Sequence, residues 1–94
     1  MATVVTAGQD FEIRVITLNA TTDTPIDFLQ KINAFTIKCR SNVDIYLRHD
    51  INSADYFTIP AGGSLTLDVA VGNKVPCYLR SSSGTVIVEV LGTF

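Results

Sequence analysis

Apolar and polar residues alternate along most of this chain, in short runs separated by residues that favour turns. The clearest example is residues 56–71, YFTIPAGGSLTLDVAV, in which Pro60-Ala61-Gly62-Gly63 separates two alternating runs. Strict alternation is typical of a strand with one buried face. Proline lacks a backbone donor and glycine tolerates positive φ, so this tetrapeptide should end one strand and start another. We therefore predict a strand, a corner and a second strand, with Phe57 and Ile59 sharing a buried face.

The same alternation recurs along the chain, and turn residues separate its runs at intervals of about 8–12 residues. About eight short strands are expected, and no stretch has the pattern of a long helix. The pattern predicts an all-β fold, namely a single antiparallel β-sandwich, jelly-roll-like or Ig-like. The 94 residues suit one domain, so we expect residues 1–94 to form it, with residues 1–8 as an N-terminal arm or edge strand.

Three local patterns predict details of the chain path. Residues 35–39 and 43–47 lie on either side of Ser41-Asn42, which predicts a hairpin. Gly72-Asn73 predicts a tight turn. Pro76, inside the run that follows it, indicates an edge strand or a bulge, because proline cannot donate to a sheet ladder.

The one clear loop is residues 19–27, which is rich in Thr, Asn and Asp. Thr24-Pro25 suits the start of a helical turn over residues 26–31, with proline at the first helical position. Ile26 and Phe28, however, also alternate with polar neighbours as in a strand. Both alternatives stay open at this point.

Composition favours a protein that associates with other subunits. The chain is 47% hydrophobic and 17% charged, whereas globular domains average about 25% charged residues. No apolar run approaches the roughly 20 residues that span a bilayer, and no secretory signal is expected. A chain of this size buries only about 60–65% of its unfolded surface, so contacts with neighbours would add stability.

The charge argues against nucleic acid as a partner. The formal net charge is −2, and the seven Lys and Arg residues do not form a run. Lys38, Arg40, Arg48 and Arg80 nevertheless have the phase to share an outward face. A phosphate-binding surface normally needs a basic domain with a clustered stripe of cations.

Candidate catalytic and metal-binding residues are sparse. His49, the single histidine, stands beside Asp50 in a polar loop, without a Gly-x-Ser-x-Gly motif or another catalytic partner. Asp50, Asn52 and Asp55 supply oxygen atoms at a spacing that suits calcium, but the same residue types are typical of turns. We therefore expect no enzymatic activity, no metal site and no cofactor.

Two cysteines, Cys39 and Cys77, are too few for a disulfide scaffold and lack metal-ligand spacing. Both fall on the apolar phase of their runs, which favours buried free thiols. A disulfide between facing strands is the alternative, since sequence does not show whether the Cβ geometry allows it. The absence of a secretory signal favours thiols kept reduced in a cytosol.

Side chains on the outward phases indicate an interaction surface. In residues 11–18, Phe11, Ile13 and Val15 form an apolar face, expected in the core, and the alternate residues, Ile16 among them, form a mixed face. Ile16, Ile87 and Leu91 fall on the phase opposite the apolar core faces of their runs, where exposed residues would form an association patch. Tyr46 and Tyr78 share the polar phase of their strands with arginines, a combination that suits a protein interface or a sugar. The predicted interface also includes both ends of the chain and consists of Val4, Val5, Tyr46, Tyr78, Ile87, Leu91 and Phe94.

Residues 32–94 resemble small β-sandwich virion proteins of tailed bacteriophages, of the decoration (cement), tail or fibre type. The likeness is carried by FTIKCRSNVDIYLRHD, YFTIPAGGSLTLDV and VPCYLRSSSGTVIVEVLGTF. The shared features are short strands, the Pro-Ala-Gly-Gly corner and a late Ser-rich turn into a valine-rich strand. This resemblance implies a structural virion protein made in the host cytoplasm. It would act as a capsid decoration protein that binds the major capsid protein lattice as a homo-oligomer, a trimer or small ring.

Two other functions are weighed against this one. A carbohydrate- or receptor-binding module of a phage tail or fibre would need Tyr46 and Tyr78 side by side on an open face. A small hydrolase would need a carboxylate pair, or His49 in a pocket. No membrane or nucleic-acid partner is expected in any of these cases.

Overall fold

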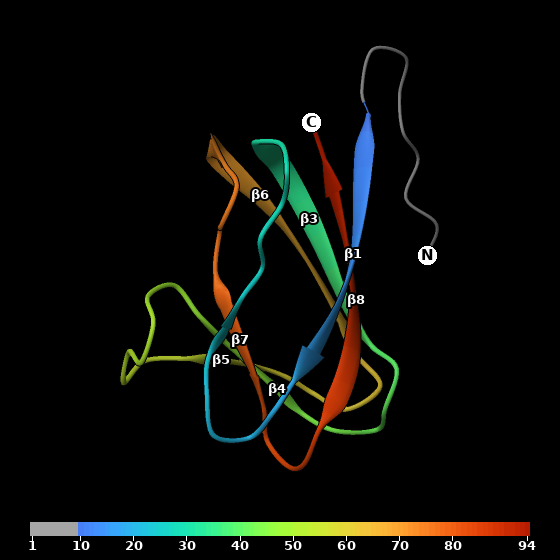
Figure 1. Cartoon of the computed structure of the whole chain (residues 1–94), viewed down its shortest axis with the longest axis vertical. Coiled ribbons are helices and arrows are strands. Elements are labelled where there is room, and N and C mark those ends of the chain that lie inside the picture. Colours follow the sequence, from blue (N-terminus) through green and yellow to red (C-terminus); the bar gives the residue numbers. More distant parts are fainter. Residues whose placement is uncertain (1–9) are drawn as a thin grey trace.

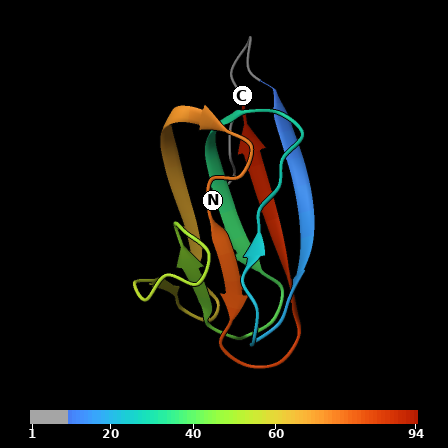
Figure 2. The ribbon, with the colours of Figure 1, turned by 60° about the vertical axis from the view of Figure 1, so that its left-hand side comes forward.

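The computed structural model describes residues 10–94, and for residues 69–73 it describes the backbone alone. Within this range eight strands form two four-stranded antiparallel sheets that pack as a sandwich (Figures 1 and 2). The long-strand sheet contains, in spatial order, β1 (Phe11–Leu18), β8 (Val86–Thr93), β3 (Ile32–Cys39) and β6 (Ser64–Asn73). The short-strand sheet contains β2 (Thr24–Pro25), β7 (Tyr78–Ser81), β4 (Ile45–Arg48) and β5 (Phe57–Ile59).

The strand order is that of a jelly roll. β1 pairs with β8, β2 with β7, β3 with β6 and β4 with β5, so the chain is folded in half and then wrapped. β8 also pairs with β3, and β7 with β4, which joins these pairs into the two sheets. An immunoglobulin sandwich has a different strand number and order, so the structure decides between the two alternatives. The predicted all-β sandwich of about eight strands is confirmed, and no helix occurs in residues 10–94.

The core lies between the sheets and is formed by aliphatic and aromatic side chains. Val86, Val88 and Val90 of β8 point into it, as their strict alternation with exposed or half-buried neighbours predicts. Each such side chain contributes about 1.5–3 kcal/mol when it is fully buried. Its other fully buried aliphatic and aromatic members are Leu18, Ile26, Phe28, Ile32, Ile37, Ile45 and Leu79.

Gly92 occupies an inward position of β8 where no side chain fits. A Cβ atom there would lie 2.7 Å from Cε1 of Phe28 and 2.8 Å from Cγ2 of Ile32. Both distances are shorter than carbon atoms tolerate. The glycine therefore allows the segment before β3 to close over the end of β8.

Residues 26–31 do not form the helical turn. The Ile26 N–H donates to the Cys77 carbonyl at 3.1 Å, and the Phe28 N–H donates to the Lys74 carbonyl at 2.8 Å. Ile26 and Phe28 are buried while their neighbours are exposed. The strand-like alternative is therefore confirmed, because an extended chain here satisfies its amides against the segment before β7.

Three predicted details of the chain path differ from the structure. β3 and β4 belong to different sheets, so Ser41-Asn42 lies in a crossover between layers, and the predicted hairpin is wrong. β6 continues through Gly72-Asn73, so the predicted turn there is also wrong. β7 begins at Tyr78, so Pro76 precedes the strand and neither lies within it nor forms a bulge in it. Alternating runs separated by a few turn residues look alike in sequence whether the chain stays in one sheet or crosses to the other.

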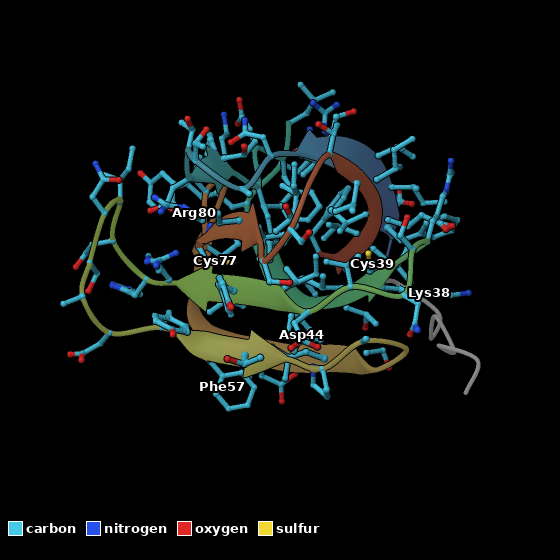
Figure 3. The ribbon with its side chains drawn as sticks, turned by 90° about the horizontal axis from the view of Figure 1, so that it is seen from below. Lys38, Cys39, Asp44, Phe57, Cys77 and Arg80 are labelled. Carbon is cyan, nitrogen blue, oxygen red and sulfur yellow. The ribbon has the colours of Figure 1, made fainter. Side chains whose placement is uncertain are left out.

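The corner after β5 carries the chain from the short-strand sheet to the long-strand sheet, as the predicted strand–corner–strand unit requires. Gly62 has φ +79°, a conformation that glycine adopts without a steric penalty. The Ala61 N–H donates to Oδ1 of Asp44 at 2.8 Å, which fixes the corner to the loop before β4 (Figure 3). The corner therefore acts as scaffold.

The buried face predicted for the first strand of this unit is half correct. Ile59 is buried, but Phe57 is 58% exposed. β5 is the edge strand of its sheet, and Phe57 points away from the body of the protein (Figure 3). A side chain at the rim of a sandwich has no facing layer to cover it.

Candidate functional site

Three large apolar side chains of β1 point away from the core. Phe11, Ile13 and Val15 are 48%, 61% and 56% exposed. The strand register explains this, because Ile13 lies opposite Leu91, which alternates with the buried valines of β8. The alternation along this strand predicts that its apolar face lies in the core, and that prediction is wrong.

The mixed face of β1 is the one that turns inward. Leu18 is fully buried, and Ile16, which was expected in an exposed patch, packs against the core. The Glu12 carboxylate accepts the Leu29 N–H at 2.9 Å and so joins β1 to the loop before β3. β1 therefore places three apolar side chains in water and a carboxylate on its inner side, the reverse of what an isolated sandwich needs.

The exposed apolar surface continues onto the neighbouring strand. Ile87 of β8 is 37% exposed, and Leu91 is half-buried on the same outer face. We define the outer apolar stripe as Phe11, Ile13, Val15, Ile87 and Leu91. It follows β1 and β8, which lie side by side along one edge of the long-strand sheet (Figure 1).

A groove of about 300 Å³ lies beside this stripe, between β1 and β3. Arg40 Nε lies 3.7 Å from Glu89 Oε2 at its rim, and both side chains are largely in solvent, so this ion pair is weak. Lys38 extends away from the sheet (Figure 3). The groove thus has one apolar and one charged side, and its lining residues are Ile13, Val15, Thr36, Lys38, Arg40, Glu89, Val90 and Leu91.

The outer face of the short-strand sheet carries a buried polar cluster instead. Asp23 Oδ1 accepts hydrogen bonds from Arg48 Nη1 at 3.1 Å and from Arg80 Nε at 2.9 Å. Its Oδ2 accepts the backbone N–H of Asn52 at 2.7 Å. Asn52 adopts φ +58°, a left-handed conformation that asparagine tolerates, and its Oδ1 accepts from Arg80 Nη2 at 3.3 Å. The cluster joins two loops to two adjacent strands, β4 and β7, and so stabilises the fold.

The role of Asp23 was not predicted, since an aspartate in a Thr-rich loop has no distinctive pattern. Arg48 and Arg80, on the outward phase of their strands, could have indicated such a carboxylate. Two neighbouring guanidinium groups repel each other unless an anion lies between them. The four basic residues expected on one face are in fact divided. Arg48 and Arg80 serve the Asp23 cluster, whereas Lys38 and Arg40 lie on the long-strand sheet.

Tyr46 and Tyr78 lie on the outer face of the short-strand sheet, two positions out of register, because Tyr46 lies opposite Arg80 and Tyr78 lies opposite Arg48. Both are half-buried. The Tyr46 ring packs against Tyr56, with centroids 4.6 Å apart and planes tilted by 55°, and the Arg48 guanidinium lies 4.9 Å from the Tyr56 ring. These rings therefore pack beside the arginine cluster and do not form a flat open platform.

The structure brings together only part of the predicted interface. Ile87 and Leu91 belong to the outer apolar stripe, whereas Tyr46 and Tyr78 lie on the other outer face of the sandwich. The missed members of the stripe are the three β1 residues. Their signal was visible as an apolar face, but alternation alone does not say which face turns inward.

The predicted contributions of the chain ends have separate outcomes. Phe94 packs partly against the core, and it exchanges two backbone hydrogen bonds with Asp10, at 2.8 and 3.0 Å. Its aromatic ring therefore belongs to this domain's own packing. Val4 and Val5 lie outside the described residues.

The residues considered for catalysis and calcium binding are solvated or otherwise engaged. His49 Nδ1 lies 3.4 Å from Asp50 Oδ1, and both side chains are almost fully exposed. Asn52 belongs to the Asp23 cluster. Within residues 10–94, no three His, Cys, Asp or Glu side chains are grouped to hold a metal ion. No helix in the same range is long and apolar enough to cross a membrane.

Both cysteines are free thiols and lie well apart, so the disulfide alternative is wrong (Figure 3). Cys77 is buried as predicted, while Cys39 is only half-buried. Burial raises the pKa of the Cys77 thiol from 9.0 to about 12, because a thiolate is poorly solvated there. Cys77 is therefore expected to behave as a small hydrophobic residue.

This environment predicts protection of Cys77 from thiol reagents. The thiolate is the reactive form, so a chromogenic disulfide reagent should modify Cys39 in the native protein and Cys77 only after unfolding. Mass spectrometry of the labelled peptides would measure the two rates. Equal native rates would contradict the burial of Cys77.

The same pKa difference predicts a loss of stability at alkaline pH. The unfolded chain releases the Cys77 proton near pH 9 and the folded chain near pH 12, so stability is unaffected below about pH 9 and declines above it. The decline approaches about 1.4 kcal/mol per pH unit. Urea unfolding at neutral and alkaline pH should show it in the wild type, and a smaller dependence in Cys77→Ala.

No protein-family model matches this chain, and no curated protein matches it. The outer apolar stripe and the groove beside it are the structural features that a functional proposal can use.

Proposed function

We propose that this protein is a structural virion protein that acts as a capsid decoration protein, associating with other virion subunits through the outer apolar stripe. The observation that carries the proposal is the orientation of β1. Phe11, Ile13 and Val15 face solvent while Glu12 lies on the inner side. Contiguous apolar patches on a single domain often mark interaction sites, so this arrangement supports a contact of the outer face with another protein.

The size of the stripe fits an association surface. Its five side chains expose on the order of 400 Å² of apolar surface, within the range at which patches on single domains mark interaction sites. Covering this area is worth about 10 kcal/mol at roughly 25 cal/mol per Å², before the cost of ordering both partners is subtracted. On a capsid lattice the contact repeats many times, and multivalency strengthens the attachment.

Other properties agree with a structural role in a virion. The thiols are free, as expected for a protein made in a reducing host cytoplasm. The jelly roll occurs in viral capsid and lectin domains alike, so the fold is compatible with decoration but does not by itself assign it. A sugar-binding role has weaker support, because Tyr46 and Tyr78 are half-buried and Tyr46 packs on Tyr56.

Co-sedimentation tests the proposal. The purified protein is mixed with virions of the source phage that were prepared without it. The wild type should bind to saturation, and cryo-microscopy of the particles should show added density at regular lattice positions. Ile13→Glu should weaken binding at least tenfold, because it places a charge in the centre of the stripe.

A matched control exists within the chain. Ile51 is 55% exposed in the loop before β5, so Ile51→Glu makes the same chemical change away from the stripe. This variant should bind as the wild type does. Failure of the wild type to bind, or equal binding by Ile13→Glu, would contradict the proposed function.

A further inference from the structure

We infer that the outer apolar stripe is covered by a second copy of this chain, packed face to face about a two-fold axis with the strands antiparallel. The inference rests on the proposed function in so far as the stripe is an association surface. It makes a second copy of this chain the virion subunit that covers the stripe, so that the pair is the unit that attaches to the particle. An isologous contact requires a surface that complements itself when it is turned by 180°. The outer face of the long-strand sheet has this property in its relief and in its charge.

The relief of the face differs between its two ends. At one end the register aligns Phe11 with Thr93, and Phe11 is 48% exposed. The groove of about 300 Å³ extends from Ile13 and Leu91 toward the other end, where Arg40 lies. Turning one copy so that its strands run antiparallel brings its projecting phenyl ring toward the partner's groove, and the same happens in return. A parallel pairing would place both rings at one end and leave both grooves unfilled.

The charges on this face also differ between its two ends. Lys38 and Arg40 lie at the groove end, where Glu89 offsets only one of them. Asp68 lies opposite Ala34, at the end where Phe11 projects. Among the described side chains, neither Lys38 nor Asp68 has an ion-pair partner. An antiparallel two-fold pair brings the Asp68 end of each copy toward the Lys38 end of the other.

The area of the face is sufficient for a stable pair. Strands of about eight residues measure about 27 Å, and four strands measure about 19 Å across, which gives roughly 500 Å² in projection. Side-chain relief raises the accessible area toward the roughly 800 Å² per partner of a standard interface. Apolar residues along β1 and β8 lie beside the polar residues Thr36, Lys38 and Asp68 of β3 and β6, so the face has an apolar side and a polar side.

Sedimentation equilibrium of the purified protein over a wide concentration range tests the inference. The wild type should approach twice the chain mass, and Ile13→Glu should raise the dissociation constant at least tenfold. Ile51→Glu should dimerise normally. A wild type that stays monomeric at all concentrations, a trimer, or an Ile13→Glu variant that dimerises normally would overturn the inference.

A charge exchange tests the antiparallel geometry independently of folding. Lys38→Glu and Asp68→Lys should each weaken dimerisation, because each brings like charges together across the interface. The double variant should restore it, since the charges are complementary again. Circular dichroism would check that each variant keeps the fold, and failure of the double variant to recover would overturn the antiparallel arrangement.

The two proposals fail separately. Dimerisation without binding to virions would support this inference and contradict the proposed function. Binding to virions by a protein that sediments as a monomer would support the proposed function and contradict this inference.

Discussion

Replacement of Asp23 by alanine is expected to lower the free energy of unfolding by about 3–5 kcal/mol, as is usual when one member of a buried ion pair is removed. The carboxylate is buried and is shared by Arg48 and Arg80, at 3.1 and 2.9 Å. Without it, two guanidinium groups from adjacent strands are left close together with no anion between them. Domains of this size are stabilised by only about 5–15 kcal/mol in total, so Asp23→Ala should lose a large part of its stability.

Urea unfolding followed by circular dichroism would measure this effect. Asp50→Ala is the matched control, because that carboxylate is exposed and its one ion-pair partner within residues 10–94 is the exposed His49. Its effect should stay within about 0.5 kcal/mol. A similar loss of unfolding free energy in the two variants would show that the Asp23 cluster does not stabilise the fold as described above.

Gly92→Ala should have the second largest effect, with a loss of about 1–3 kcal/mol from overpacking. The added methyl group would lie 2.7 Å from Cε1 and 2.9 Å from Cζ of Phe28, and 2.8 Å from Cγ2 of Ile32. To relieve these contacts, the segment before β3 must move away from the end of β8. Both sets of atoms are in the core, so the movement exposes apolar surface.

A double-mutant cycle identifies the cause of this loss. Phe28→Leu removes both ring atoms that the new methyl group would meet, so it should cost less in the Gly92→Ala background than in the wild type. A coupling energy of about 0.5–3 kcal/mol is expected for residues in direct contact. Additive losses would contradict a direct clash between position 92 and Phe28.

The sequence predicted the fold class because alternation is a local property that strands retain wherever they lie. Val86, Val88 and Val90 show its success, since their strand has one wholly apolar inner face. β1 shows its limit. Phe11, Ile13 and Val15 form the more apolar face, and an argument based on one domain alone must turn that face inward.

The interactions that the sequence did not reveal are long-range. Asp23 contacts Arg48 and Arg80, which lie 25 and 57 positions away along the chain. No local pattern records such a pairing. The crossover at Ser41-Asn42 is similar, because the choice between a hairpin and a change of sheet depends on which strands become neighbours, and that is decided by the whole jelly roll.

The nested pairing of strands has a consequence for how the protein acquires its structure during synthesis. β8 is the last strand in sequence, yet it lies between β1 and β3 in the long-strand sheet. Until β8 leaves the ribosome, β1 lacks its one strand partner within residues 10–94, and its exposed Phe11, Ile13 and Val15 belong to a segment that is not yet paired with it. Pairing between strands that lie far apart in sequence slows folding. The long loop between β1 and β8 must close before the contacts between these strands can stabilise the fold. The nascent chain therefore carries an unpaired apolar strand until β8 has been synthesised.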